Sequence, residues 1–142
     1  GSRERKLLNA AQREERLSIL LPKNEIPYVR SDNGEASPSF VYELPASDAD
    51  EVTYNLYMGG DIANTVLDTG RDELPSILIY GDSFTNPVEC VAYLSFDKTH
   101  SLDLRHYREM GLEDYIRQVR PEVVVCIRDY DFLLDPEGNG GS

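Results

Sequence analysis

The feature that most constrains the fold is an alternation of three apolar runs with two helix-like segments in the second half of the chain. The apolar runs are 76–80, 100–104 and 122–128, and the helix-like segments are 87–96 and 111–120. The first and third runs are rich in β-branched residues, the second reads as a strand through its alternating leucines, and the segments between the runs place apolar residues at helical spacing. A strand–helix–strand–helix–strand order needs crossover connections, which bring the strands side by side in parallel. We therefore expect an α/β fold, three-layer and flavodoxin-like in layout, with a mainly parallel sheet.

The remainder of the chain carries weaker patterns. Residues 3–21 are charged, with leucines at roughly helical spacing, and predict a short amphipathic helix; the Pro-rich stretch after them favours turns and short extended pieces. At 142 residues the chain is long enough for one domain with a sizeable core. We expect an N-terminal arm over residues 1–50, an α/β domain over 51–135 and a flexible tail over 136–142.

Polar residues follow each of the three apolar runs. Gly81, Asp82 and Ser83 come after the first, Asp103, Arg105 and His106 lie at or after the end of the second, and Arg128, Asp129 and Asp131 lie at or after the end of the third. Parallel strands end at one edge of their sheet, and open α/β sheets bind ligands at this edge. The sequence therefore predicts the functional site there.

The stretch Gly81-Asp82-Ser83 places a serine at the corner between a strand and a helix. Backbone N–H groups at a helix N-terminus can stabilise an oxyanion, so Ser83 is predicted to be a nucleophile. The predicted oxyanion donors are the N–H of Ser83 itself, Gly81 and Asn86, and Asp82 is expected to support them. The alternative is that Ser83 is an ordinary helix cap, since serine is a preferred capping residue.

A serine nucleophile needs a base within hydrogen-bond reach. His106 follows the second run at the correct edge, and Asp103, three residues before it, can orient it. Arg105 is expected to have a supporting role. The alternative is that His106 is a surface or packing residue beside a structural salt bridge between Asp103 and Arg105. His100, the other histidine, is expected to be structural.

The composition argues against several classes of function. A formal net charge of -12 would repel nucleic acid and anionic lipid surfaces, and no apolar run approaches the roughly 20 residues that span a bilayer. The sequence has no phosphate-binding glycine motif and no metal-ligand spacing, so we expect neither a cofactor nor a metal. Both cysteines, Cys90 and Cys126, are expected to be buried free thiols.

Residues 54–135 resemble a known family. The Gly-Asp-Ser corner is similar to block one of the SGNH/GDSL hydrolases. A longer match, through "YNLYMGGDIANTVLDTG", "ILIYGDSFTNP", "SLDLRHY", "GLEDYIRQVRPEVVVCI" and "RDYDFLLD", is similar to the C-terminal half of bacterial DHHW-type proteins. These are relatives of the alginate O-acetyltransferases of the AlgX and AlgJ type.

The resemblance implies an extracytoplasmic serine esterase or O-acetyltransferase that acts on a polysaccharide. Ser83 and Asn86 match the family pattern. The family's Asp-His-His-Trp motif lies upstream of the serine, and this chain contains no tryptophan. Three explanations remain: the Asp-His pair lies in an upstream part of a longer protein, the domain has lost catalysis, or His106 has taken over as base.

Two alternative functions stay open. The first is a non-catalytic cell-surface or carbohydrate-binding module, in which Tyr107 and Tyr130 stack on sugar rings. The second is a receiver-like or flavodoxin-like module that binds phosphate at the same corner. The expected partners are a carbohydrate or acyl-ester substrate and the upstream part of the parent protein.

Overall fold

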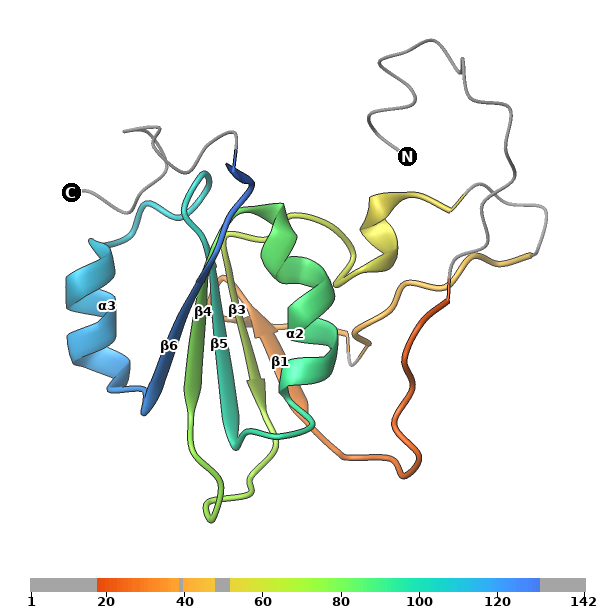
Figure 1. The fold of residues 1–142 in the computed structure, drawn as a ribbon, viewed down its shortest axis with the longest axis horizontal. Coiled ribbons are helices and arrows are strands. Elements are labelled where there is room, and N and C mark those ends of the chain that lie inside the picture. Colours follow the sequence, from red (N-terminus) through yellow and green to blue (C-terminus); the bar gives the residue numbers. More distant parts are fainter. Residues whose placement is uncertain (1–17, 39, 48–51, 131–142) are drawn as a thin grey trace, which may run out of the picture.

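A mixed sheet of six strands organises the chain. The computed structural model describes residues 18–38, 40–47 and 52–130. In sequence order the strands are β1 (Val29–Asp32), β2 (Glu35–Ala36), β3 (Asn64–Asp68), β4 (Ile77–Gly81), β5 (Lys98–Asp103) and β6 (Val123–Ile127). They lie in the order β2-β1-β3-β5-β4-β6. Figure 1 shows helices α2 (Asn86–Ala92) and α3 (Leu112–Val119) on opposite sides of the sheet.

The three strands expected from the apolar runs form the parallel part of this sheet. β4 lies between β5 and β6 and runs parallel to both. Gly81, the last residue of β4, is level with Asp103 of β5 and Ile127 of β6. The expectation that these strands end at one edge is therefore confirmed, and their polar continuations start side by side.

The expectation of a mainly parallel sheet is wrong, because the other half is antiparallel. β3 runs antiparallel to β5, β1 to β3, and β2 to β1. Asn33 and Gly34 connect β1 to β2, and both have positive φ angles, 51° and 81°. Such a two-residue turn fits a hairpin, whereas a parallel connection needs a dozen or more residues.

Residues 1–50 contribute to the sheet as well. The sequence did not show whether this segment joins the core, and the structure places β1 and β2 within it, at the edge beside β3. The predicted helix over residues 3–21 lies mostly outside the described residues, and 18–21 adopt no regular structure. The predicted tail also lies outside them. None of the described helices is long and apolar enough to cross a lipid bilayer.

Side chains of β4 alternate between two apolar layers. Ile77 and Ile79 pack with Ala92 of α2, whereas Leu78 belongs to the cluster that contains Tyr115 of α3. A third cluster joins α2 to the N-terminal half of the chain through Val41, Met58, Leu67, Cys90 and Tyr93. Cys90 is buried as expected, but Cys126 is exposed, because it lies on the solvent side of edge strand β6.

Candidate functional site

Ser83 begins the turn between β4 and α2, at the edge where the parallel strands end. It is the first residue of a short 3-10 helix, η2 (Ser83–Thr85), and is partly exposed. Gly81 precedes the turn, where β6 comes very close. A Cβ atom on Gly81 would lie 1.7 Å from the carbonyl oxygen of Ile127. Only glycine leaves room for this approach, which explains why a glycine begins the Gly81-Asp82-Ser83 corner.

Asp82, and not Ser83, caps the turn. The Asp82 carboxylate is almost fully buried and accepts hydrogen bonds from the N–H of Phe84 at 2.9 Å and of Asp129 at 2.8 Å. It therefore fixes the turn to the segment that follows β6. The alternative role of Ser83 as a cap is not realised. Among the described residues, nothing accepts a hydrogen bond from the Ser83 hydroxyl or from its backbone N–H.

Asn86 and Gly81 are placed differently from the predicted oxyanion donors. The Asn86 side chain is buried and donates to the Gly60 carbonyl at 3.2 Å and to Asp61 Oδ1 at 3.1 Å. Both N–H bonds of its amide are thus used inside the protein. Gly81 is buried in a strand with neighbours on both sides, so its N–H faces the sheet. The N–H of Ser83 is the remaining predicted donor.

Asp103 and Arg105 form the salt bridge that one interpretation of the sequence predicted. Asp103 is only 2 % exposed, and its carboxylate accepts from Arg105 Nε at 2.9 Å and from Nη2 at 2.5 Å. These hydrogen bonds, and the negative charge of Asp103, raise the pKa of the Arg105 guanidinium. The pair is a forked ion pair, the strongest geometry for arginine and a carboxylate.

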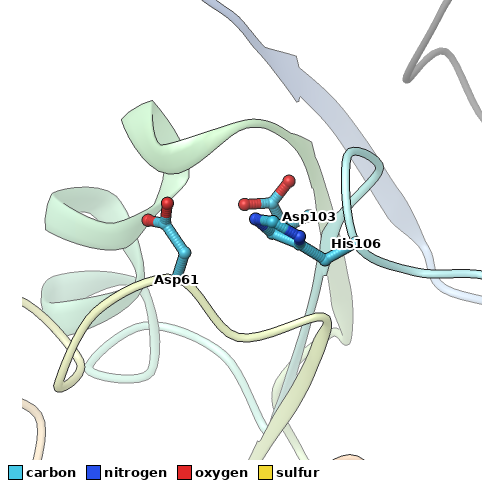
Figure 2. Close-up of side chains that lie close together, drawn as sticks. All are labelled: Asp61, Asp103 and His106. Carbon is cyan, nitrogen blue, oxygen red and sulfur yellow. The ribbon is translucent and has the colours of Figure 1, made fainter.

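His106 lies exposed at the same edge, as Figure 2 shows. One ring nitrogen of His106 and one carboxylate oxygen each of Asp61 and Asp103 lie within 4.8 Å of one another. The backbone N–H of His106 donates to the Asp103 carbonyl oxygen at 2.9 Å, but in the described part of the chain its imidazole makes no hydrogen bond to the Asp103 carboxylate. Two carboxylates and a histidine can hold a metal ion, but here the Arg105 guanidinium already bridges the two carboxylates.

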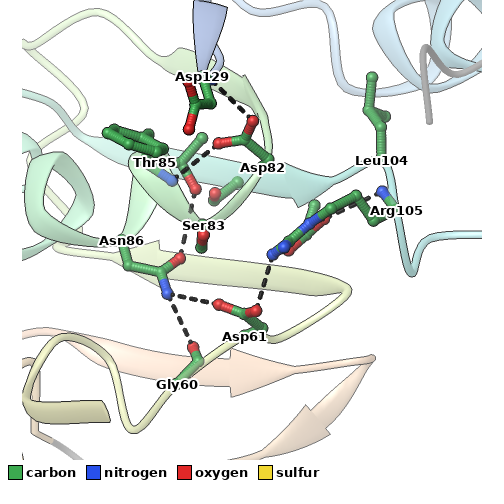
Figure 3. Close-up of polar contacts among 12 residues, drawn as sticks. Gly60, Asp61, Asp82, Ser83, Thr85, Asn86, Leu104, Arg105 and Asp129 are labelled. Atoms are coloured by element: carbon green, nitrogen blue, oxygen red, sulfur yellow. Dashed lines mark hydrogen bonds and ion pairs between the residues drawn. The ribbon is translucent and has the colours of Figure 1, made fainter. Parts of the chain in front are cut away.

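Two residues at the site were missed in the sequence. Asp61 contacts both Asn86 and Arg105, at 3.1 Å and 2.7 Å (Figure 3). The Tyr54 hydroxyl donates to the carbonyl oxygen of Ser83 at 2.8 Å, and partial burial together with nearby acidic and phenolic groups raises the Tyr54 pKa to about 12. Asp61 directly follows the Gly59-Gly60 pair, which is the only local signal of a special loop.

A buried carboxyl group lies behind the turn. Glu89 Oε1 accepts hydrogen bonds from the hydroxyls of Thr85 and Ser101, both at 2.6 Å. Burial raises the pKa of Glu89, which favours its protonated form. Glu89 thus connects the turn of Ser83 to strand β5 without approaching the solvent.

The expected pair of sugar-stacking tyrosines is not present. Tyr107 is 6 % exposed and packs edge-on against Tyr115, so it cannot stack on a ligand. Tyr130 is 75 % exposed, and Phe84, next to Ser83, is 49 % exposed. His100 lies within strand β5, with its Nδ1 3.1 Å from the Tyr115 hydroxyl, and burial lowers its pKa.

Solved structures with the same fold exist. No family model matches the chain, and no curated protein is similar enough in sequence to count as a relative. A structure of Bacillus cereus PatB1 with a sulfonyl adduct matches with a TM-score of 0.69 and 23% identity, over 85% of this chain and 42% of that chain. A second PatB1 structure matches with a TM-score of 0.65 and 24% identity, over 80% and 38%. A DHHW family protein from Eubacterium siraeum gives 0.55 and 23%, over 71% and 35%.

The chain therefore spans less than half the length of each of these proteins. At such identities the likeness concerns the fold. The described part of this chain has the α/β fold of PatB1 and of a DHHW family protein.

Proposed function

We propose that this chain is the serine-bearing part of an SGNH-like acyl-ester hydrolase or O-acetyltransferase. In this proposal the domain has the three-layer, flavodoxin-like form of that group, is related to the alginate O-acetyltransferases, and acts outside the cytoplasm on a polysaccharide. The shared fold with PatB1 and a DHHW family protein supports it. The observation that carries it is Ser83, whose hydroxyl and N–H have no hydrogen-bond partner among the described residues, at the carboxyl edge of a parallel strand.

The proposed reaction is acyl transfer through a covalent intermediate. A base removes the proton of the Ser83 hydroxyl as its oxygen bonds to the acyl carbon of the ester. The carbonyl oxygen becomes an oxyanion that accepts a hydrogen bond from the Ser83 N–H. The intermediate then collapses: the bond to the leaving alkoxide breaks, the base returns the proton to it, and acyl-Ser83 remains. An acceptor hydroxyl or water repeats these steps to release the acyl group.

The base has two candidate sources. His106 is exposed and at the correct edge, but Asp103 is engaged by Arg105 and does not orient it. The other source is an Asp-His pair from the upstream part of a longer polypeptide, which would complete the site. In either case Asp82 and Tyr54 fix the backbone around the nucleophile.

Covalent labelling tests the proposal. The chain is incubated with phenylmethylsulfonyl fluoride, and intact mass is measured for the wild type, for Ser83→Ala and for the matched control Ser95→Ala, an exposed serine beyond α2. We expect one sulfonyl adduct on the wild type and on Ser95→Ala, and none on Ser83→Ala. An unlabelled wild type, or an adduct that persists in Ser83→Ala, contradicts activation of Ser83 within these residues.

The variant His106→Gln tests whether His106 is the base. If His106 is the base, labelling stops in His106→Gln while the fold, measured by circular dichroism, stays intact. If labelling continues at the wild-type rate, His106 is not the base. The histidine is exposed, so its replacement removes no packed side chain.

A second candidate function is favoured by the aromatic surface beside Ser83. Phe84 and Tyr130 are exposed, and Tyr130 directly follows Asp129, whose N–H donates to Asp82. Exposed aromatic rings of this kind can pack on sugar rings, which suits a non-catalytic carbohydrate-binding module. This function requires saturable shifts of the Phe84 and Tyr130 resonances with a neutral glycan, together with no covalent adduct at Ser83.

A further inference from the structure

We infer that Asp61 is a positioning residue that fixes the turn of Ser83 against the segment that carries Arg105 and His106. The inference rests on the proposed acyl transfer at Ser83. Asp61 lies on the loop before β3, and Figure 3 shows its carboxylate between the side chains of Asn86 and Arg105. Three parts of the chain that are distant in sequence thus meet at one carboxylate.

The first contact holds the nucleophile turn. Asn86 is the first residue of α2, three positions after Ser83, and is 3 % exposed. Its amide donates to Asp61 Oδ1 at 3.1 Å and to the Gly60 carbonyl at 3.2 Å. The loop that carries Asp61 therefore binds the start of α2 at two points, and a shift of this loop would move the turn before the helix.

The second contact holds the segment after β5. Arg105 Nη2 donates to Asp61 Oδ2 at 2.7 Å, while Arg105 is also forked on the buried Asp103. His106 is the next residue. Asp103 binds the Nε and Nη2 edge of the guanidinium, and Asp61 accepts from the same Nη2, so Asp61 ties this edge to the loop before β3.

Both contacts require a carboxylate. Asp61 accepts from a different donor on each oxygen. An asparagine of the same shape has one acceptor oxygen, so its NH₂ group would face an N–H of either Asn86 or Arg105. Asp61 is about one-third exposed, so its replacement leaves no cavity in the core. A loss of Ser83 reactivity on replacing Asp61 can therefore be distinguished from the loss of stability that follows when a packed core residue is replaced.

The test compares Asp61→Asn with the matched control Asp68→Asn. Asp68 is an equally exposed aspartate at the far end of β3 that pairs with Lys98. In the ¹⁵N-labelled chain, we expect Asp61→Asn to shift the resonances of the Asn86 side-chain amide and of Arg105 Nε–H, and Asp68→Asn to leave both in place. Unmoved resonances in Asp61→Asn would overturn the inference.

The second readout is the rate of labelling of Ser83. We expect Asp61→Asn to lower the limiting rate of sulfonyl adduct formation at least about tenfold, because misplaced reacting groups lose rate steeply, and to leave the half-saturating reagent concentration unchanged. A limiting rate equal to that of Asp68→Asn would refute the positioning role. If wild-type Ser83 is not labelled at all, activation of Ser83 within these residues is contradicted and the rate comparison falls away, and the two side-chain resonances decide the case of Asp61 independently.

Discussion

Replacing Gly81 with alanine tests how the corner is built. The added Cβ atom would lie 1.7 Å from the carbonyl oxygen and 2.7 Å from the carbonyl carbon of Ile127. Both are backbone atoms of β6, so no side-chain rotation relieves the contact. To restore van der Waals contact, the end of β6 must retreat by roughly 1.5 Å or more.

The free-energy cost follows from what such a retreat breaks. Overpacking of this kind costs about 1–3 kcal/mol. The Asp129 N–H, two residues beyond Ile127, would also leave the buried Asp82 carboxylate, and a buried acceptor that loses its donor costs about 1–3 kcal/mol more. We therefore expect Gly81→Ala to lower the free energy of unfolding by about 3 kcal/mol or more, a large part of the 5–15 kcal/mol typical of a domain.

Urea unfolding followed by circular dichroism measures this cost, with Gly70→Ala as control. Gly70 has a φ angle of +63° and no atom within 4 Å of the added Cβ, so its replacement adds only the backbone strain of about 1 kcal/mol. With a urea slope of about 1–3 kcal/mol/M, Gly81→Ala should unfold at least about 1 M earlier than the wild type. A midpoint for Gly81→Ala at or above that of Gly70→Ala would refute the steric argument.

Two further predictions concern groups behind the turn. Burial raises the Glu89 pKa, so the stabilising contribution of Glu89 is complete below the ordinary value of 4.5 and is lost as the pH rises toward the raised value. Glu89→Gln keeps an acceptor for Thr85 and Ser101, and in urea titrations it should become more stable relative to the wild type as the pH rises above 4.5. A stability difference that is independent of pH would contradict this. Tyr54→Phe removes the hydrogen bond to the Ser83 carbonyl and should cost about 0.5–1.5 kcal/mol in the same assay and slow the labelling of Ser83, whereas unchanged labelling would show that Tyr54 does not fix the turn.

The sequence predicted the parallel half of the fold well because its signals there are local. Continuous apolar runs with β-branched residues mark β4 and β6, alternating leucines mark β5, and helical spacing marks α2 and α3, so their bounds agree to within a few residues. The antiparallel half was not predicted. β1 is short and follows a Pro-rich stretch, and it pairs with β3, more than thirty residues away, so nothing in the local pattern identifies its partner.

The site shows the same division. Its residues were found because parallel strands end together, which brings Ser83 after β4 and His106 after β5 to one edge. Their hydrogen bonds were not predictable. Asp61 reaches Asn86 across 25 positions and Arg105 across 44, and no spacing in the sequence encodes such a contact. Tyr107 was misplaced because an aromatic residue after a strand can turn toward solvent or toward the core, and here it packs on Tyr115.

The polar side chains at the corner differ in whether their hydrogen-bonding groups are already used within the protein or remain available to a substrate. Asp82 and Asp103 are almost fully buried, with their oxygens on backbone N–H groups or on Arg105, and the Asn86 amide is saturated. Replacing one of them should therefore lower stability and Ser83 reactivity together, because the turn loses its support. The Ser83 hydroxyl has no partner among the described residues, so Ser83→Ala should remove the reactivity and leave the unfolding midpoint within about 0.5 kcal/mol of the wild type. A Ser83→Ala variant that unfolds as easily as a variant of Asp82 would show that the hydroxyl supports the fold and is not held free for chemistry.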